Sequence, residues 1–177
     1  IFEQQCVIMN KLLTLACTIT VLTAIGQVNP QLQPLSFQLS KISNDIALER
    51  LPDFELTKAA YADAEDEKKG ELPKFSRSIF TNITLHNTGT WLSLANGDRL
   101  WRVKIVSPGA QALLLYYNQF YLPPGSTLHV YTEDHEDIRG AFTTVNNPRT
   151  GYYSTGLTHG ESCTVEYYEP MSVKGLG

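Results

Sequence analysis

Apolar and polar residues alternate with a period of two along most of the chain from residue 75 onward. The clearest example is RLWRVKIVS at residues 99–107, where Trp101, Val103 and Ile105 share one face and Arg102 and Lys104 share the other. Such alternation is typical of a strand with one buried face. The same pattern predicts further strands at residues 77–86, 91–95, 111–120, 126–132, 141–145, 152–158 and 163–168.

Turn-forming residues separate these predicted strands. Asn96-Gly97 lies between two alternating runs, which is a strong hairpin signal. We expect Leu92 and Leu94 to join Trp101 on one side of the core around this turn. The segment LPPG at 122–125 predicts a corner at a sheet margin, because proline fixes the backbone and donates no ladder hydrogen bond. HGESC at 159–163 predicts a hairpin turn.

Seven or eight short strands at regular spacing, with no convincing long helix between them, predict an all-β fold. The expected architecture is an antiparallel β-sandwich, jelly-roll-like, over residues 75–170. Residues 27–74 differ, with scattered apolar positions, three prolines before Pro73 and the charged run DAEDEKKGE at 63–71. Residues 59–69 predict a turn or two of helix, and the charge predicts a largely irregular, acidic connector.

The N-terminal part has the pattern of a secretory signal peptide at residues 9–26. A short positive region at 9–11 precedes an apolar stretch, and Ala24-Ile25-Gly26 places small residues where signal peptidase reads them, so we expect cleavage between Gly26 and Gln27. Residues 1–8 are interpreted as upstream read-through. The alternative is a lipoprotein modified at Cys17, but only about five apolar residues would precede it, against roughly 7–15 in a usual apolar region. The chain is therefore predicted to be secreted, with no membrane span after signal removal.

Composition narrows the function classes. The 177 residues carry a formal net charge of −4 without a basic stripe, which argues against a nucleic-acid partner. No dinucleotide-binding or phosphate-binding glycine motif is present, so no cofactor is predicted. After signal removal one cysteine remains, Cys163. Either it is a small buried hydrophobic residue or its partner lies elsewhere, and its place in an alternating strand favours burial.

Two short segments invite a catalytic or metal-binding interpretation. HGESC at 159–163 lacks the second glycine of a nucleophile elbow, so no catalytic residue is predicted there. EDHED at 133–137, including Asp134 and Asp137, lacks the spaced ligands of a calcium loop and is interpreted as a solvated loop without a metal.

The tyrosine pairs 116–117 and 152–153 each place one ring outside the core, because neighbouring residues on a strand face opposite ways. Such rings can stack on sugars or on a partner protein, although sheets are rich in tyrosine in any case.

A resemblance to a known family rests on TGTWLSLANGDRLWRVKIVSPGAQALLLYYNQFYLPPGSTLHVYTED, followed by IRGAFTTVNN and VEYYEP. These segments resemble the region ahead of the catalytic domain in secreted bacterial trypsin-like serine endopeptidases, of the lysyl endopeptidase type. The similarity covers residues 75–177, and weakly 35–52. The distinctive features are NGDRLWR, SPGA, the LPPG corner, two adjacent asparagines, and a closing segment with Glu, Tyr, Pro and Lys-Gly.

The resemblance implies a non-catalytic pro-region of a protease precursor that assists folding or keeps the enzyme inactive. Residues 171–177 would begin a linker to a missing catalytic domain, which would be the partner of this domain. In a lysine-cleaving family, Lys174-Gly175 is a candidate processing site, although maturation later in the chain is the alternative. Another possibility is an accessory domain that binds a polysaccharide or cell surface. A free-standing enzyme is disfavoured, because the catalytic motifs of the family are absent.

Overall fold

The computed structural model describes residues 32–177 except 41, 44, 54–55, 73 and 75, and this part is built mostly of β-strands with few helices. Residues Gly26 and Gln27 of the predicted cleavage site, and Cys17, lie outside the described residues. The elements are α2 (Leu35–Gln38), β1 (Ala47–Arg50), α3 (Leu56–Lys68), β2 (Thr90–Ser93), β3 (Arg99–Val106), β4 (Ala112–Tyr117), β5 (Thr127–Tyr131), β6 (Ile138–Phe142), η1 (Thr144–Asn146), β7 (Tyr153–His159), β8 (Ser162–Glu169) and η2 (Met171–Val173).

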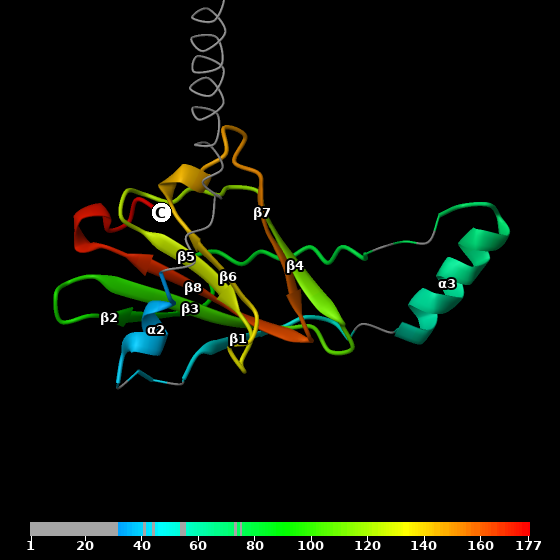
Figure 1. Ribbon diagram of the computed structural model, residues 1–177, viewed down its shortest axis with the longest axis horizontal. Coiled ribbons are helices and arrows are strands. Elements are labelled where there is room, and N and C mark those ends of the chain that lie inside the picture. The colour runs from blue at the N-terminus through cyan, green and yellow to red at the C-terminus, as the bar shows by residue number, and fades with distance from the viewer. Residues whose placement is uncertain (1–31, 41, 44, 54–55, 73, 75) are drawn as a thin grey trace, which may run out of the picture.

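The described strands form a six-stranded sheet and a two-stranded sheet (Figure 1). The larger sheet has the order β1-β3-β8-β5-β6. β2 pairs with the first half of β3 and β1 with its second half, so both lie along the edge of β3 opposite β8. Strands β4 and β7 form the smaller sheet. The strand pairs described within residues 75–170 are all antiparallel, as predicted. Strand β1, which precedes that range and was expected to be irregular, runs parallel to β3. The fold is thus β-rich with a mixed sheet.

Alternation along the central strands places one face of the large sheet in the core. Trp101, Val103 and Ile105 from β3 lie beside Cys163, Val165 and Tyr167 from β8, which the register pairs one to one. The small sheet contributes to the same apolar cluster through Leu113, Leu115, Tyr117 and Tyr153, and the loop residues Phe120 and Leu122 complete it. Cys163 is buried, as its alternation predicted, and burial raises the pKa of its thiol to about 12.

The hairpin between β2 and β3 forms around Asn96-Gly97, as predicted. Gly97 has a positive φ of 89°, which favours glycine, and the Leu94 backbone N–H donates to the Asp98 carbonyl. The predicted face of Leu92 is wrong. Leu92 lies opposite Leu100, and it is Trp91 that lies opposite Trp101 and packs against the core.

Residues 77–86 form no strand, contrary to the alternation in their sequence. The Asn87 side chain accepts from the Thr84 backbone N–H at 2.9 Å and donates to the Asn82 carbonyl at 2.8 Å, which closes a turn. Side-chain hydrogen bonds of this kind compete with strand pairing. Phe80 is 95% exposed, and only Ile83 and Leu85 reach the core.

The predicted strand at 141–145 is shifted. β6 instead starts at Ile138 and gives way to η1 after Phe142.

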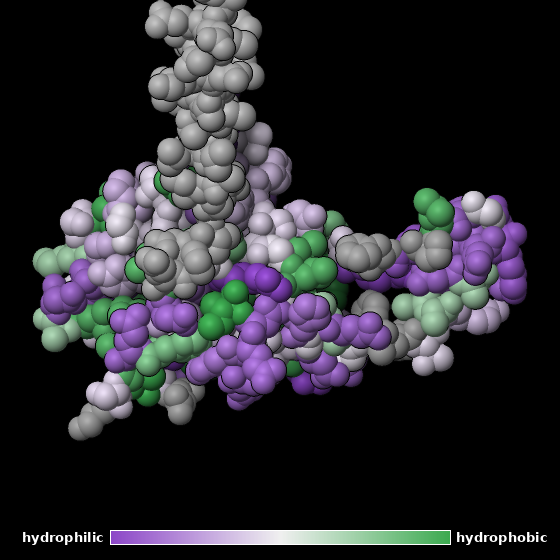
Figure 2. Space-filling model, viewed as in Figure 1, coloured by the Kyte–Doolittle hydropathy of each residue, from purple (hydrophilic) through white to green (hydrophobic). Residues whose placement is uncertain are grey.

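The expectation of a largely irregular connector over 27–74 is also wrong for the part that the structure describes. It contains α2, the sheet strand β1 and the helix α3, whose 13 residues exceed the predicted turn or two. Figure 1 shows α3 projecting away from the sheets, and on the face in Figure 2 its surface is largely hydrophilic. We call residues 56–72 the arm.

The second face of the large sheet carries buried polar residues that contact Leu32, Ser36 and Ser43. Arg102, Glu166 and His129 lie side by side on β3, β8 and β5. Glu166 accepts from the Tyr131 hydroxyl at 3.0 Å and from the Ser36 backbone N–H at 3.2 Å, while Arg102 donates to the Ser43 carbonyl. The pKa of His129 is lowered by burial. These contacts hold the N-terminal segment on the sheet.

Candidate functional site

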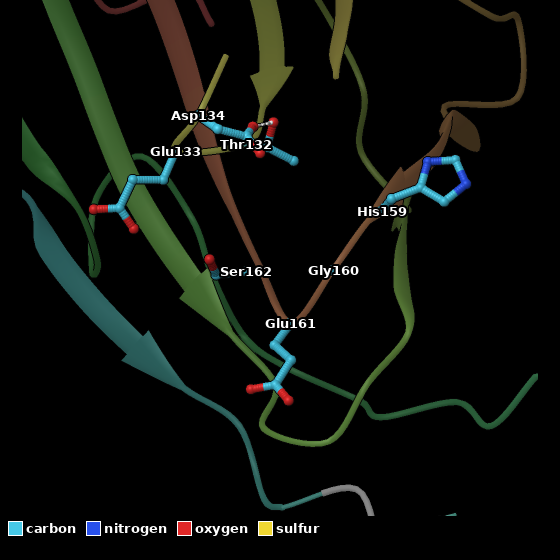
Figure 3. Close-up of a pocket in the computed structure, with 7 residues that line it drawn as sticks. All are labelled: Thr132, Glu133, Asp134, His159, Gly160, Glu161 and Ser162. Atoms are coloured by element: carbon cyan, nitrogen blue, oxygen red, sulfur yellow. Dashed lines mark hydrogen bonds between the residues drawn. The ribbon is translucent and has the colours of Figure 1, made fainter. Parts of the chain in front are cut away.

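An open hollow of about 410 Å³ lies where the β5–β6 loop meets the turn between β7 and β8 (Figure 3). The acidic EDHED segment at 133–137 and the HGESC segment at 159–163 meet here. Its lining residues are Thr132, Glu133, Asp134, His159, Gly160, Glu161 and Ser162. The turn at Gly160-Glu161 connects strands of different sheets, so it is a corner between the two sheets rather than the predicted hairpin turn.

Asp137 joins the two sides of this region. Its carboxylate accepts from the His159 backbone N–H at 3.0 Å, contacts the His159 ring nitrogen Nδ1 at 2.9 Å and pairs with Arg139 at 2.8 Å. Burial acts to raise the pKa of Asp137, but the hydrogen bonds from His159 and the charge of Arg139 outweigh it and lower that pKa. The carboxylate therefore ties the end of β7 to the β5–β6 loop.

An Asp–His pair with a serine nearby has the composition of a hydrolytic triad, but the geometry differs. In a triad the imidazole bridges the carboxylate and the serine hydroxyl. Figure 3 shows the His159 ring on the side away from Ser162, and Glu161 also points away from the hollow. The His159 ring therefore contacts Asp137 but does not bridge it to Ser162.

Glu133 and Asp134 of the same loop have partners of their own. Glu133 pairs with Lys104 at 2.6 Å, which lowers the pKa of Glu133. Asp134 accepts from the Thr132 hydroxyl at 2.5 Å and from the Glu136 backbone N–H at 3.1 Å, and the first of these contacts contributes most to lowering its pKa. Within residues 32–177, apart from the few positions not described, no three His, Cys, Asp or Glu side chains are placed to hold one metal ion.

The predicted processing residues Lys174 and Gly175 lie in the exposed segment that follows β8. We call residues 170–177 the tail. The tail is largely exposed, as expected for a connector. It also folds back on the β2–β3 hairpin, which was not expected. The Met171 backbone N–H donates to Asp98 at 2.8 Å, and the Gly175 backbone N–H donates to Glu169 at 3.0 Å.

We call the carboxylates of Asp98 and Glu169 the clamp. Asp98 also accepts from the Tyr168 hydroxyl at 2.5 Å, and this hydrogen bond is the largest contribution to the lowered pKa of Asp98. Glu169 is 1% exposed and is paired with Arg99, whose Nε lies 2.7 Å from it. The Arg99 guanidinium in turn lies 4.0 Å from the Trp91 ring centroid. Contacts with side chains of strands β2, β3 and β8 therefore fix the position of the clamp.

Reasoning from the sequence missed the clamp, although one signal was present. Strand alternation through Cys163, Val165 and Tyr167 places Glu169 on the core face. A buried carboxylate needs a partner, and the register sets Arg99 directly opposite. The partner could not be predicted without that register.

The tyrosine prediction is confirmed for both pairs. Tyr116 and Tyr152 are 78% and 70% exposed, whereas Tyr117 and Tyr153 pack against the core.

Comparisons with known proteins add no assignment, since no family model and no solved structure matches the chain. Among the described helices, none has the length and apolar character required to cross a lipid bilayer.

Proposed function

We propose that the chain is the non-catalytic N-terminal pro-region of a secreted bacterial trypsin-like serine protease precursor of the lysyl endopeptidase type. Its role is to assist folding of the protease, to keep it inactive during export, or both. The partner is the protease domain that follows in the same precursor. A signal peptide at residues 9–26, cleaved between Gly26 and Gln27, directs the precursor out of the cell.

The observation that carries this proposal is that the segments responsible for the resemblance meet one another in space. Asp98 and Arg99 of NGDRLWR contact Tyr168 and Glu169 of the closing segment. The corner LPPG is held by the second of the two adjacent asparagines, since Asn147 exchanges hydrogen bonds with the Leu122 backbone at 2.8 and 2.9 Å. The residues that carry the resemblance therefore hold parts of the fold together. This supports a resemblance in fold to the pro-regions of these proteases.

We also propose that the domain has a sandwich-like architecture. The packing of the two sheets against each other supports this proposal. The β4–β7 pair places Leu113 and Tyr153 on the apolar cluster formed by β3, β5 and β8.

Deletion within the full precursor tests the proposal. Precursors with and without residues 27–177 are secreted from the same host, and hydrolysis of a lysine-containing peptide is measured in the medium. We expect the deletion to abolish activity and co-expression of this chain to restore it. A control precursor lacking only the arm, residues 56–72, should keep its activity. Full activity from the 27–177 deletion would refute the role in folding, and early intracellular activity would support the inhibitory role alone.

A second candidate function is favoured by one observation, the exposure of Tyr116 and Tyr152. Rings on an outer sheet surface can stack on sugar faces, so the domain would hold the enzyme at a polysaccharide or cell surface. Pull-down of the purified chain on insoluble polysaccharides tests this function. Binding that is lost in the Tyr116→Ala, Tyr152→Ala double variant would favour it over the pro-region role.

A further inference from the structure

The chain contains two Lys-Gly bonds, Lys69-Gly70 in the arm and Lys174-Gly175 in the tail. Both lysines are exposed. Both glycines have a positive φ, 77° and 80°, and no heavy atom lies near the position of an added Cβ in either case. The two bonds therefore match in sequence, exposure and local backbone.

They differ in what binds the glycine N–H. Gly70 donates to the carbonyl of Glu67, so only the end of helix α3 holds it. Gly175 donates to the carboxylate of Glu169, which is almost fully buried and paired with Arg99. The nitrogen bound by this carboxylate is the nitrogen of the Lys174-Gly175 peptide bond itself.

The rest of the tail is also closed into turns. Lys174 donates its backbone N–H to the Met171 carbonyl, and Leu176 donates to the Val173 carbonyl at 3.0 Å. Asp98 anchors the start of these turns through Met171. A protein groove that pairs with a peptide main chain takes the peptide in an extended form, with its N–H and C=O groups free. A closed tail cannot present the bond in that form.

We infer that the clamp of Asp98 and Glu169 gates proteolysis at Lys174-Gly175, so that this bond resists a lysine-cleaving peptidase until the tail is released. The gate would regulate cleavage at the candidate processing site, Lys174-Gly175. This inference rests on the proposed function. Cleavage itself is ordinary hydrolysis, in which one water yields a carboxylate on Lys174 and an amine on Gly175. Opening the clamp is the step that the fold controls.

Limited digestion of the purified chain with an added lysine-specific endopeptidase tests the gate without any downstream domain. Mass spectrometry follows cleavage after Lys69, Lys174 and Lys104. Lys104 lies within β3 and reports opening of the whole sheet. We expect cleavage after Lys69 to be at least about tenfold faster than after Lys174, as the loss of hydrogen bonds to charged groups would imply. Equal rates at these two sites would overturn the inference.

Clamp variants then separate local release from unfolding. Glu169→Gln and Asp98→Asn should each accelerate cleavage after Lys174 several-fold while cleavage after Lys104 stays slow. The matched control Glu161→Gln removes a glutamate of the β7–β8 corner and should change neither rate. Unchanged cleavage after Lys174 in both clamp variants, or a parallel rise after Lys104, would contradict the gate.

Amide hydrogen exchange of the unsubstituted chain gives a readout that needs no variant. The Gly175 N–H should exchange at least about tenfold more slowly than the Gly70 N–H, because only the first is bound to a buried carboxylate. Equal exchange would overturn the gate even if every clamp variant failed to fold. None of these results depends on whether a protease follows in the precursor, so the gate and the proposed function can fail separately.

Discussion

The arm and the tail lie at opposite ends of the molecule, and both are exposed, yet their charged residues act differently (Figure 1). In the arm, Asp66 pairs with Lys74 at 2.7 Å and Asp63 with Arg77 at 2.6 Å; both cations follow the arm in the chain, and both pairs are in contact with solvent. In the tail region, the carboxylate that holds the chain is buried in the sheet beside Arg99. Exposed ion pairs contribute little to stability, whereas a buried charge that loses its partner is strongly destabilising. Burial, more than the number of ion pairs, therefore decides which end is held.

The largest expected effect concerns the core beneath the hairpin on which the tail rests. Trp101 is 4% exposed and its indole N–H donates to the Thr88 carbonyl at 2.8 Å. Trp101→Ala should lower the free energy of unfolding by about 3–5 kcal/mol, as expected for a buried aromatic residue. Tyr61→Ala in the arm, where the ring is 71% exposed, is the control and should leave urea denaturation unchanged. Equal effects would remove the distinction between the two regions.

The next effect isolates the ion pair. Arg99→Ala leaves Glu169 buried without its partner and should cost about 3 kcal/mol, at the lower end of the range for such pairs because the Arg99 side chain is 22% exposed. Lys74→Ala removes the cation that pairs with Asp66 of the arm and should not change the melting temperature measurably. Calorimetry of both variants makes the comparison, and a silent Arg99→Ala variant would contradict the role of the buried pair.

A smaller effect concerns the tyrosine that supports the clamp. The hydrogen bond to Asp98 is the main reason that the pKa of Tyr168 is raised to about 12. The hydroxyl should therefore remain a donor at a pH where an ordinary tyrosine, with a pKa of about 10, has ionised. Ultraviolet difference titration of the chain and of Tyr168→Phe should assign a transition near pH 12 to this residue. A Tyr168 transition near pH 10 would argue against the contact.

The smallest effect is the pH dependence of tail closure. Hydrogen bonds from Tyr168, Met171 and Asn96 lower the pKa of Asp98. A carboxyl group with a lowered folded pKa stabilises the fold above its unfolded pKa of about 3.9, and this contribution is lost as the pH falls through the folded pKa. The protection factor of the Met171 N–H, which corrects for the intrinsic pH dependence of amide exchange, should thus stay constant from pH 7 to pH 5 and fall below about pH 4. A fall already between pH 7 and pH 5 would exclude Asp98 as the controlling group.

The sequence predicted the strands whose alternation is strongest. β3, β5 and β8 lie where their patterns indicated, because each has apolar residues on one face and a tertiary partner on both sides. β1 could not be recognised in the same way. Its four residues ALER contain no β-branched or aromatic side chain, and its strand conformation depends on parallel pairing with β3.

The errors also have physical causes. Residues 77–86 alternate like a strand, but Asn82, Thr84 and Asn87 bind the backbone locally and form a turn instead. The face of Leu92 depends on the register with β3, which one residue of shift reverses. For the candidate site, Lys174 and Gly175 came from the sequence, whereas the clamp required the pairing of Arg99 with Glu169.

Processing of the complete precursor tests the central claim, that this domain serves a protease and is separated from it at the tail. The precursor and its Lys174→Gln variant are secreted from the same host, and the N-termini of the products are sequenced. We predict a product that begins at Gly175 in the unmodified precursor and is missing in the variant. Identical N-termini in both would contradict processing at this bond.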